Sequence, residues 1–296
     1  MNFLYQLLRF SRLHTVIGTS LSIVSLYTIA HLLGGSATEI AYLLLTLGTC
    51  LFANVYITGL NQLLDIDIDR INKPYLPLAS GAWSVRTGRI VVGICLIGAL
   101  VGAFFGNFWL RWTVLLSLLL GTIYSAPPVR LKRFPFWAAF CILAVRGLIV
   151  NLGLFLNFYA PIGTFADVPS IIWILTVVMF VYSILIAFFK DMPDLEGDKK
   201  YGISTFSLRL GVDSIHRIGS TLLIALYILL IAGTFLFSGN FNPWIFAGFH
   251  LLLLLALLYL NRTVDLRRQK SIARYYQGVW VLFFMEYIGT ALSVMG

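Results

Sequence analysis

The chain has 296 residues, of which 59% are hydrophobic and 11% are charged, and its mean hydropathy is +0.91. Soluble domains usually carry about 25% charged residues, so this composition argues against a soluble enzyme, a secreted domain or a disordered protein. The net charge of +9 is no indication of nucleic-acid binding, because basic residues also collect in the cytoplasmic loops of membrane proteins. The three cysteines lie in apolar runs without paired spacing and predict neither disulfides nor a zinc site.

Apolar runs of about 20 residues recur along the chain, a length that favours membrane-spanning helices over the shorter, alternating strands of a barrel. Lipid offers no hydrogen-bond partners to a free backbone, which also requires helices. Residues 1–8 are expected to form a short amphipathic segment at the interface. The nine predicted spans are residues 14–33, 40–64, 88–106, 110–125, 134–157, 170–190, 214–237, 243–260 and 275–295. No long linker separates them, so residues 1–296 are predicted to form a single all-α transmembrane domain.

Lysine and arginine predict the orientation of these spans. If the side of the N-terminus is called the inner side, the inner segments with their flanks contain 19 of the 21 basic residues. The outer side contains Arg111 alone, and Arg146 lies within the fifth predicted span. By the positive-inside rule, the N-terminus and the inner loops are expected in the cytoplasm.

Acidic residues concentrate in two inner segments, each at the end of a predicted span. Seven of the 12 lie in residues 61–69 (NQLLDIDID) and 190–198 (KDMPDLEGD). Acidic residues contribute little to membrane topology. The positive-inside rule therefore does not explain why they gather here.

The spacing of the first segment predicts one shared helix face. Asn61, Asp65 and Asp69 lie at i, i+4 and i+8, which aligns them if the helix continues beyond the membrane surface. Asn54 and Thr58 extend the same stripe toward the membrane interior. This stripe is the first half of the predicted site.

The second segment has a comparable but weaker pattern. Asp191, Asp194 and Asp198 lie at i, i+3 and i+7. Pro193 is expected to bend or break a helix there, because proline removes a backbone hydrogen bond. The carboxylates would then stay close in space without sharing a strict helix face.

Carboxylates that gather in this way repel one another unless a cation lies between them. Oxygen ligands without nearby cysteine or histidine favour Mg²⁺ or Mn²⁺, and Mg²⁺ commonly binds one or two carboxylates together with phosphate oxygens. Two facing segments thus fit a pair of ions that holds a diphosphate. Asp67 and Glu196 point off the stripes and are expected to be solvated. The alternative is that each segment is an ordinary polar loop paired with neighbouring basic residues.

Basic residues lie on the same inner side. Lys73 follows the first segment, Lys190 begins the second, and Arg130, Lys132 and Arg133 lie between the fourth and fifth spans. Topology alone would place basic residues there. Beside the carboxylates, however, they indicate an anion site and could stabilise the charge of a departing diphosphate.

Several stretches resemble one known family. NQLLDIDIDRINKPYLPLASG (61–81), YSAPPVRLKR (124–133) and KDMPDLEGDKKYGISTF (190–206) are similar to the UbiA-type intramembrane aromatic prenyltransferases. The form NQxxDxxxD and the stretch AVRGLIVNLG (144–153) resemble the homogentisate prenyltransferases of cyanobacteria and plastids. The resemblance extends over the whole chain.

This resemblance implies nine helices around a central cavity, with Mg²⁺ holding a prenyl diphosphate between the two acidic segments. It implies that the metal and diphosphate groups are Asn61, Asp65, Asp69, Asp191, Asp194 and Asp198. It also implies diphosphate contacts by Lys73, Tyr124, Arg130, Lys132 and Lys190. The implied reaction transfers a prenyl group, phytyl in the first instance, to homogentisate with decarboxylation. The implied product is a methyl-phytyl-benzoquinol of tocopherol biosynthesis.

Arg146 carries a separate hypothesis. It lies about 12 residues into the fifth span, where a charge is costly and by default indicates function. We expect it to face the cavity and bind the carboxylate of the acceptor; the alternative is a structural hydrogen bond to a neighbouring helix. His14, near the inner edge, is expected to have an interfacial or structural role.

Other functions remain open at this level. A solanesyltransferase of homogentisate or a chlorophyll synthase would share the two-segment plan and differ in donor or acceptor. A diphosphatase would use similar metal ligands, and a transporter would place its ionisable residues nearer the midplane. The expected location is the thylakoid or plasma membrane of a cyanobacterium-like cell.

Overall fold

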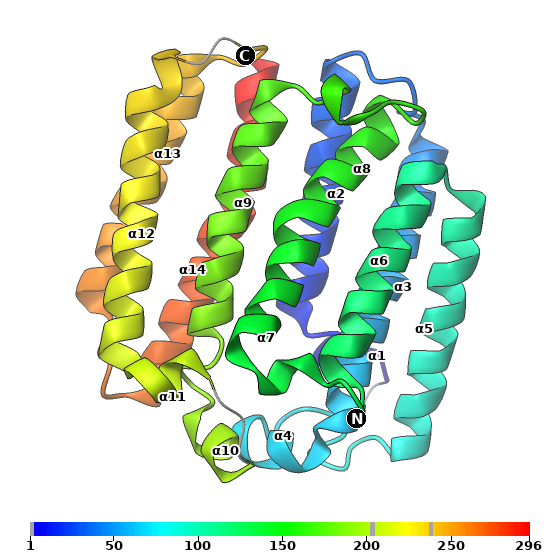
Figure 1. Ribbon diagram of the computed structural model, residues 1–296, viewed down its shortest axis with the longest axis vertical. Coiled ribbons are helices and arrows are strands. Elements are labelled where there is room, and N and C mark those ends of the chain that lie inside the picture. The colour runs from blue at the N-terminus through cyan, green and yellow to red at the C-terminus, as the bar shows by residue number, and fades with distance from the viewer. Residues whose placement is uncertain (1–2, 202–204, 237–238) are drawn as a thin grey trace.

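The computed structural model describes residues 3–201, 205–236 and 239–296, without the side chains of residues 196–198. Within this part the chain is helical, and nine helices are long and apolar enough to cross a membrane. They run side by side in one bundle (Figure 1). These spans are α2 (Leu13–Leu32), α3 (Ile40–Leu64), α5 (Val85–Phe105), α6 (Phe108–Ser125), α7 to α8 (Pro135–Tyr159), α9 (Ser170–Phe189), α12 with η4 (Val212–Leu236), α13 (Pro243–Thr263) and α14 (Gln269–Met295).

These bounds confirm the all-α membrane fold and closely match the predicted spans. The largest difference is α14, which begins at Gln269 rather than at residue 275. Hydropathy marks only the apolar part of a helix, and the polar first turns of α14 remain helical beyond it. Similarly, α5 begins at Val85 because the Ser84 side chain accepts a hydrogen bond from the amide of Thr87 and caps the helix.

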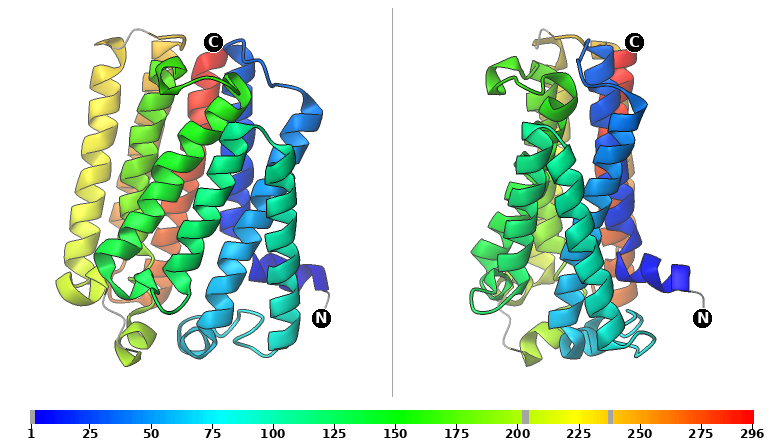
Figure 2. Two further views of the ribbon diagram at one scale, coloured as in Figure 1. Left: turned by 45° about the vertical axis from the view of Figure 1, so that its right-hand side comes forward. Right: turned by 90° about the vertical axis from the view of Figure 1, so that its right-hand side faces the viewer.

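Short helices gather at the end of the bundle that holds the N-terminus, which we call the inner end; the C-terminus lies at the opposite end (Figure 1). They are α1 (Phe3–Phe10), α4 (Ile66–Asn72), η1 (Leu131–Arg133), α10 (Leu195–Lys200) and α11 (Phe206–Leu210). Helix α4 contacts α10, although they are far apart in sequence. Helix α1 projects sideways from the bundle (Figure 2), as expected for the predicted interfacial segment. A further 3₁₀ turn, η3 (Phe165–Asp167), lies at the other end.

Polar side chains tie the helices together toward the outer end. The hydroxyl of Tyr42 donates to Asn157 Oδ1 at 2.7 Å and accepts a hydrogen bond from the amide of Asn107 at 3.1 Å. Asn157 in turn donates to Thr46 Oγ1 at 3.2 Å. Buried hydrogen bonds of this kind satisfy polar groups that lipid cannot. They join α3, the start of α6 and α8.

The fifth span changes its helical geometry in the middle. It consists of α7 (Pro135–Ile142), a π-helical turn η2 (Leu143–Ile149) and α8 (Val150–Tyr159). Wider turns of this kind occur mostly as local insertions and often at functional sites. Arg146 lies within this turn.

Helices α3 and α5 approach closely through glycines of α5. A Cβ atom at Gly98 would lie 2.8 Å from the ring of Phe52, and one at Gly102 would clash with Thr49 Oγ1. Gly98 and Gly102 have the GxxxG spacing that lets membrane helices pack closely. The α3–α5 pair therefore depends on the absence of a side chain at Gly102.

Gly102→Val is expected to lower the stability of the protein by about 2 kcal/mol or more, because the new side chain must displace Thr49. Thermal unfolding in detergent would measure this as a lower Tm. Gly93→Val is the matched control, since a Cβ at Gly93 on the same helix meets no atom within 4 Å. Equal losses in the two variants would contradict the proposed close contact.

Candidate active site

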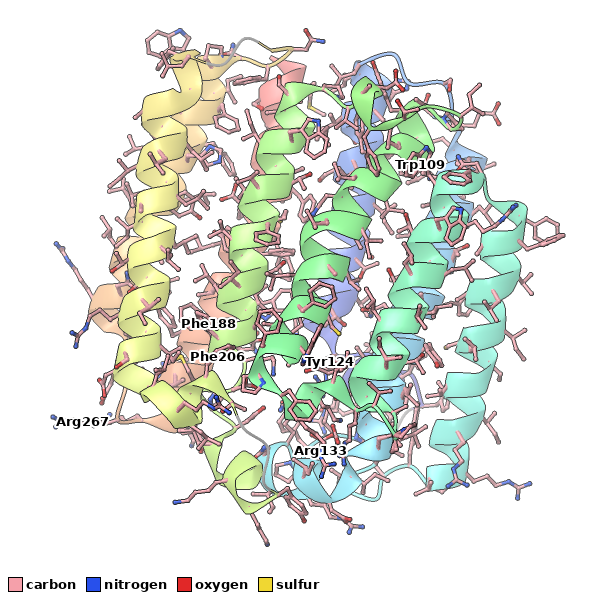
Figure 3. The ribbon with its side chains drawn as sticks, viewed as in Figure 1. Trp109, Tyr124, Arg133, Phe188, Phe206 and Arg267 are labelled. Atoms are coloured by element: carbon pink, nitrogen blue, oxygen red, sulfur yellow. The ribbon has the colours of Figure 1, made fainter. Side chains whose placement is uncertain are left out.

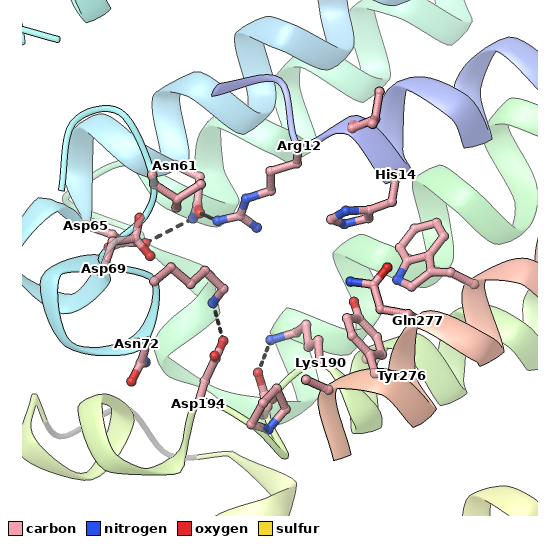
Figure 4. Close-up of a pocket in the computed structure, with 18 of the residues that line it drawn as sticks. Arg12, His14, Asn61, Asp65, Asp69, Asn72, Lys190, Asp194, Tyr276 and Gln277 are labelled. Carbon is pink, nitrogen blue, oxygen red and sulfur yellow. Dashed lines mark hydrogen bonds and ion pairs between the residues drawn. The ribbon is translucent and has the colours of Figure 1, made fainter. Parts of the chain in front are cut away.

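A cavity of about 1300 Å³ lies at the inner end of the bundle. Its wall includes residues of both acidic segments, which come from α3, α4 and the loop after α9. Figure 4 shows Arg12 and the labelled acidic residues around one open space, with Tyr276 and Gln277 of α14 across from them. The predicted residues that line it are Asn61, Asp65, Asp69, Lys73, Tyr124, Lys132, Lys190, Asp191 and Asp194.

The first acidic segment does not form one continuous helix, so this part of the prediction is wrong. Helix α3 ends at Leu64, and α4 begins at Ile66 after a change of backbone direction at Asp65. Asp65 and Asp69 are nevertheless both buried and both line the cavity. After the break, α4 runs across the inner end of the bundle, where it meets α10 (Figure 1).

The second segment is interrupted where proline was expected to interrupt it. Helix α9 ends at Phe189, a turn follows, and α10 begins at Leu195. Asp191 and Asp194 therefore line the cavity from a turn and not from a helix face. Asp198 lies within α10, but its side chain is outside the described part of the chain.

Asp65 is held by cations and by an amide. Its Oδ1 accepts a hydrogen bond from Arg130 Nη2 at 2.9 Å, and its Oδ2 pairs with Lys132. Asn61 Nδ2 donates to the same Oδ2 at 3.1 Å. Burial lowers the pKa of Lys132, and the attraction of Asp65 opposes that shift. Arg130 thus acts through Asp65 and is not part of the cavity wall itself.

An ion pair joins the chain just after the first acidic segment to the second segment. Lys73, after α4, pairs with Asp194, 121 residues further along the chain. Burial alone would lower the pKa of Lys73, but the carboxylates of Asp194 and Asp69 outweigh it and raise the pKa. Lys190 Nζ lies 2.5 Å from Asp191 Oδ1, and burial raises the pKa of Asp191 against this attraction. Cations and carboxylates therefore alternate around the mouth of the cavity.

Asp69 carries a buried negative charge that the described residues satisfy only in part. It is 5% exposed, and its Oδ2 is buried without a hydrogen-bond partner among the described residues. Burial raises its pKa to about 6, although Arg12 and Lys73 lower it. A bound cation would satisfy this oxygen, so the donor set fits Mg²⁺. No three acidic, histidine or cysteine side chains in the described ranges form a complete metal cage, and Mg²⁺ usually takes only one or two carboxylates beside phosphate and water.

Asp67 and Glu196 were expected to be solvated and to lie outside the site. Asp67 is exposed and pairs with Arg70 at 2.8 Å on the surface. The side chain of Glu196 lies outside the described part.

Tyr124 lies toward the inner end of α6, whereas Trp109 lies near the opposite end (Figure 3).

Arg12 was not predicted as a site residue. It lines the cavity and precedes α2 in a left-handed conformation with φ of 53°. Its Nη2 donates to Asn61 Oδ1 at 3.0 Å, and its Nε is buried without a partner in the described chain. Backbone strain in a non-glycine residue often marks a functional site. The sequence signal was only a basic residue at the membrane edge, which topology explains equally well.

Aromatic residues of α14 form another part of the cavity wall. Tyr276, Trp280 and Phe284 line the cavity together with His14 of α2. The rings of His14 and Trp280 meet edge to face, with centroids 5.0 Å apart. His14 is thus on the cavity wall, while its expected structural role stays a prediction.

Arg146 does not line the large cavity, so the expectation that it faces that cavity is wrong; it lines a different pocket. A smaller pocket of about 170 Å³ lies between α2, α3, α6, the fifth span and α14, and Arg146 lines it. The guanidinium lies over the ring of Trp280, 4.6 Å from its centroid, and 5.7 Å from that of Phe283.

Comparisons with known proteins agree with this architecture. The model of the UbiA prenyltransferase family matches residues 22–287. The chain is 45% identical to "Homogentisate phytyltransferase" of Synechocystis over 95% of this chain and 92% of that protein. It is 40% identical to "Homogentisate phytyltransferase 1, chloroplastic" of Arabidopsis thaliana over 95% of this chain and 73% of that one.

The fold is also similar to that of a solved structure. A UbiA homolog from Archaeoglobus fulgidus bound to DMAPP and Mg²⁺ superimposes with a TM-score of 0.64 over 98% of this chain and 99% of that chain. The two sequences are 19% identical, so this likeness concerns the fold.

Proposed function

The chain belongs to the UbiA prenyltransferase family and is an integral, multi-pass membrane protein, and we propose that it transfers a prenyl group from a prenyl diphosphate to homogentisate. Phytyl is the proposed donor group, as in the names of the two similar proteins. The observation that carries the proposal is the meeting of two acidic segments, through Lys73 and Asp194, at the mouth of one large cavity.

The cavity offers the two environments that such a donor needs. Its inner mouth holds cations and carboxylates, which suit a diphosphate beside water. Its deeper wall holds the rings of Tyr276, Trp280 and Phe284, which suit an oil-like chain. A volume of about 1300 Å³ leaves room for both parts of the molecule.

The charged residues have distinct proposed tasks. Asp65, Asp69, Asp191 and Asp194, with Asn61, would hold Mg²⁺, and we propose the same for Asp198. Mg²⁺, when bound, would neutralise the diphosphate and favour cleavage of the allylic C–O bond. Lys73, Lys132, Lys190 and Arg12 would attract the diphosphate and stabilise its charge as it leaves. Tyr124 lines the same cavity and could donate a hydrogen bond to it.

In the proposed transfer, the C–O bond breaks and its electron pair leaves with the diphosphate. A new C–C bond forms to a carbon of the acceptor ring, which then loses its proton. The acceptor carboxylate leaves as CO₂ and a proton takes its place. The aromatic wall would exclude water and stabilise positive charge on the allylic carbon through the ring faces. The product would serve tocopherol biosynthesis, with the N-terminus and the cavity mouth on the cytoplasmic side.

The test is an assay of the purified protein with homogentisate, Mg²⁺ and a series of phytyl, geranylgeranyl and solanesyl diphosphates. We expect a prenylated quinol, loss of its formation with EDTA, and recovery when Mg²⁺ is added in excess. The donor series distinguishes phytyl from solanesyl transfer, and chlorophyllide as an alternative acceptor tests a chlorophyll synthase. Release of diphosphate without any prenylated product would instead indicate a diphosphatase.

A further inference from the structure

The small pocket lies deeper than the acidic segments and has the size of one aromatic ring. Its volume is about 170 Å³, and a cavity of about 150 Å³ is enough for benzene. It is too small for a long prenyl chain. A ligand of this pocket is therefore a small ring with few substituents.

Arg146 provides this pocket with a positive charge. No carboxylate in the described part of the chain forms an ion pair with it. Its guanidinium contacts the faces of Trp280 and Phe283 instead. A cation within the membrane is costly and usually serves a ligand or a partner. An anionic group on the ligand would supply the missing charge.

The backbone around Arg146 is fixed from a neighbouring helix. Asn151 Nδ2 donates to the carbonyl oxygens of Arg146 and Gly147, both at 2.9 Å. The hydroxyl of Tyr287 on α14 donates to Asn151 Oδ1 at 2.6 Å. These bonds satisfy carbonyls of the π-helical turn and orient Arg146 before any ligand binds. Such support is what a precise binding residue requires.

The opposite walls present hydrogen-bond acceptors. The hydroxyls of Ser22, Thr58 and Ser117 donate their hydrogens to backbone carbonyls of their own helices at 2.7 to 2.9 Å. Their oxygen lone pairs remain for other donors. Asn54 uses its amide nitrogen on Thr15, which leaves its carbonyl oxygen as an acceptor. The pocket therefore suits a ligand whose own hydroxyls donate.

The pocket adjoins the place where the donor would react. Thr58 lines the small pocket and Asn61 lines the large cavity, and these residues lie three positions apart on α3, a rise of about 4.5 Å. Trp280 lines the large cavity and its ring contacts the Arg146 guanidinium of the small pocket, so the two spaces lie next to each other at this contact. A ring in the small pocket would lie about one helical turn deeper than the diphosphate, next to the first carbons of the prenyl chain.

We propose that this small pocket is the acceptor site and selects a single aromatic ring that carries hydroxyl groups and one carboxylate, with the carboxylate at Arg146. The proposal rests on the proposed function and adds to it the location and the basis of acceptor choice. Loss of CO₂ removes the group that Arg146 binds, so the neutral product leaves the pocket more readily than the substrate. A macrocyclic acceptor does not fit a pocket of this size.

The experiment compares kinetics of Arg146→Met and wild type in lipid nanodiscs. Loss of one charged hydrogen-bonded contact is expected to raise the KM for homogentisate about 10- to 100-fold. The KM for the prenyl diphosphate should stay unchanged, as should inhibition by methylhydroquinone, which lacks the carboxylate. Arg146→Lys should recover part of the loss. Arg217→Met is the control, because Arg217 is exposed and lines neither space.

A second variant covers the case in which Arg146→Met does not fold. Thr58→Val removes one acceptor with little change of shape and should raise the KM for homogentisate several-fold. A wild type that never prenylates homogentisate would contradict the proposed function itself. An active wild type with an unchanged homogentisate KM in Arg146→Met, or in Thr58→Val if that variant alone folds, would overturn only the acceptor site.

Discussion

Asp65→Asn is expected to lower kcat/KM by about 1,000-fold or more while the protein still folds. The substitution keeps the shape of the side chain but removes the charge that binds Arg130 and Lys132. It also removes a carboxylate from the set proposed to hold Mg²⁺. Steady-state assays with saturating Mg²⁺, together with gel filtration of the purified variant, would measure the effect.

Asp67→Asn is the matched control for this prediction. Asp67 lies two residues away, is exposed, and pairs with Arg70 on the surface. Exposed ion pairs contribute little to stability, so both activity and Tm should remain near the wild-type values. Comparable activity of Asp65→Asn and Asp67→Asn would show that the first acidic segment is an ordinary polar loop.

Asp191→Asn should cause a loss of similar size, and the double variant Asp65→Asn/Asp191→Asn should be about as active as either single variant. Two residues that act on the same bound group are strongly non-additive, because loss of either already disables the step. If the two substitutions lowered activity independently, two losses of about 10³-fold would multiply to a loss of about 10⁶-fold and leave no detectable turnover.

This comparison tests the central geometrical claim. Asp65 and Asp191 lie 126 positions apart in the chain, and both line the same cavity. The control is Asp213→Asn, at the start of α12 and outside both pockets. A double variant whose losses multiply would indicate that the two segments do not serve one diphosphate.

The arrangement explains how one protein can bind a donor that is charged at one end and apolar at the other. Charged groups of the first and second segments lie only at the inner end, where water can reach the cavity. Aromatic and aliphatic residues of α1, α2, α7 and α14 contribute to the rest of the wall. Arg146 is a cation deep in the bundle that does not line the large cavity, and it contacts Trp280 from its own pocket.

The fold class and the spans could be predicted closely because they depend on local properties of the chain. A run of apolar residues long enough to cross a membrane must be helical, whichever helices surround it. The sequence also shows directly that the basic residues lie mostly on one side of the spans and that many acidic residues fall in two segments. The helix ends were less predictable, since capping by Ser84 and the helical but polar start of α14 leave no mark in hydropathy.

The helix breaks within the site depend on contacts between distant segments, and residue spacing does not reveal such contacts. The i, i+4, i+8 pattern indicated a continuous helix through Asp65, whereas the chain turns there and brings α4 against α10. Arg12 lies in the site and has a left-handed backbone conformation. Neither feature follows from residue type, because each is stabilised by groups from distant parts of the sequence.

From its sequence alone, then, this protein is a helical membrane protein of the UbiA prenyltransferase family with two acidic segments at the ends of its second and sixth spans. The tertiary structure alone decided that Lys73 meets Asp194 and that Arg146 lies in a separate small pocket. It also decided that Asp69 keeps a buried oxygen without a hydrogen-bond partner among the described residues. The physical reason is that hydropathy and charge belong to each segment by itself. Which side chains face one another depends on how helices rotate and pack, down to the fit of Gly102 against Thr49.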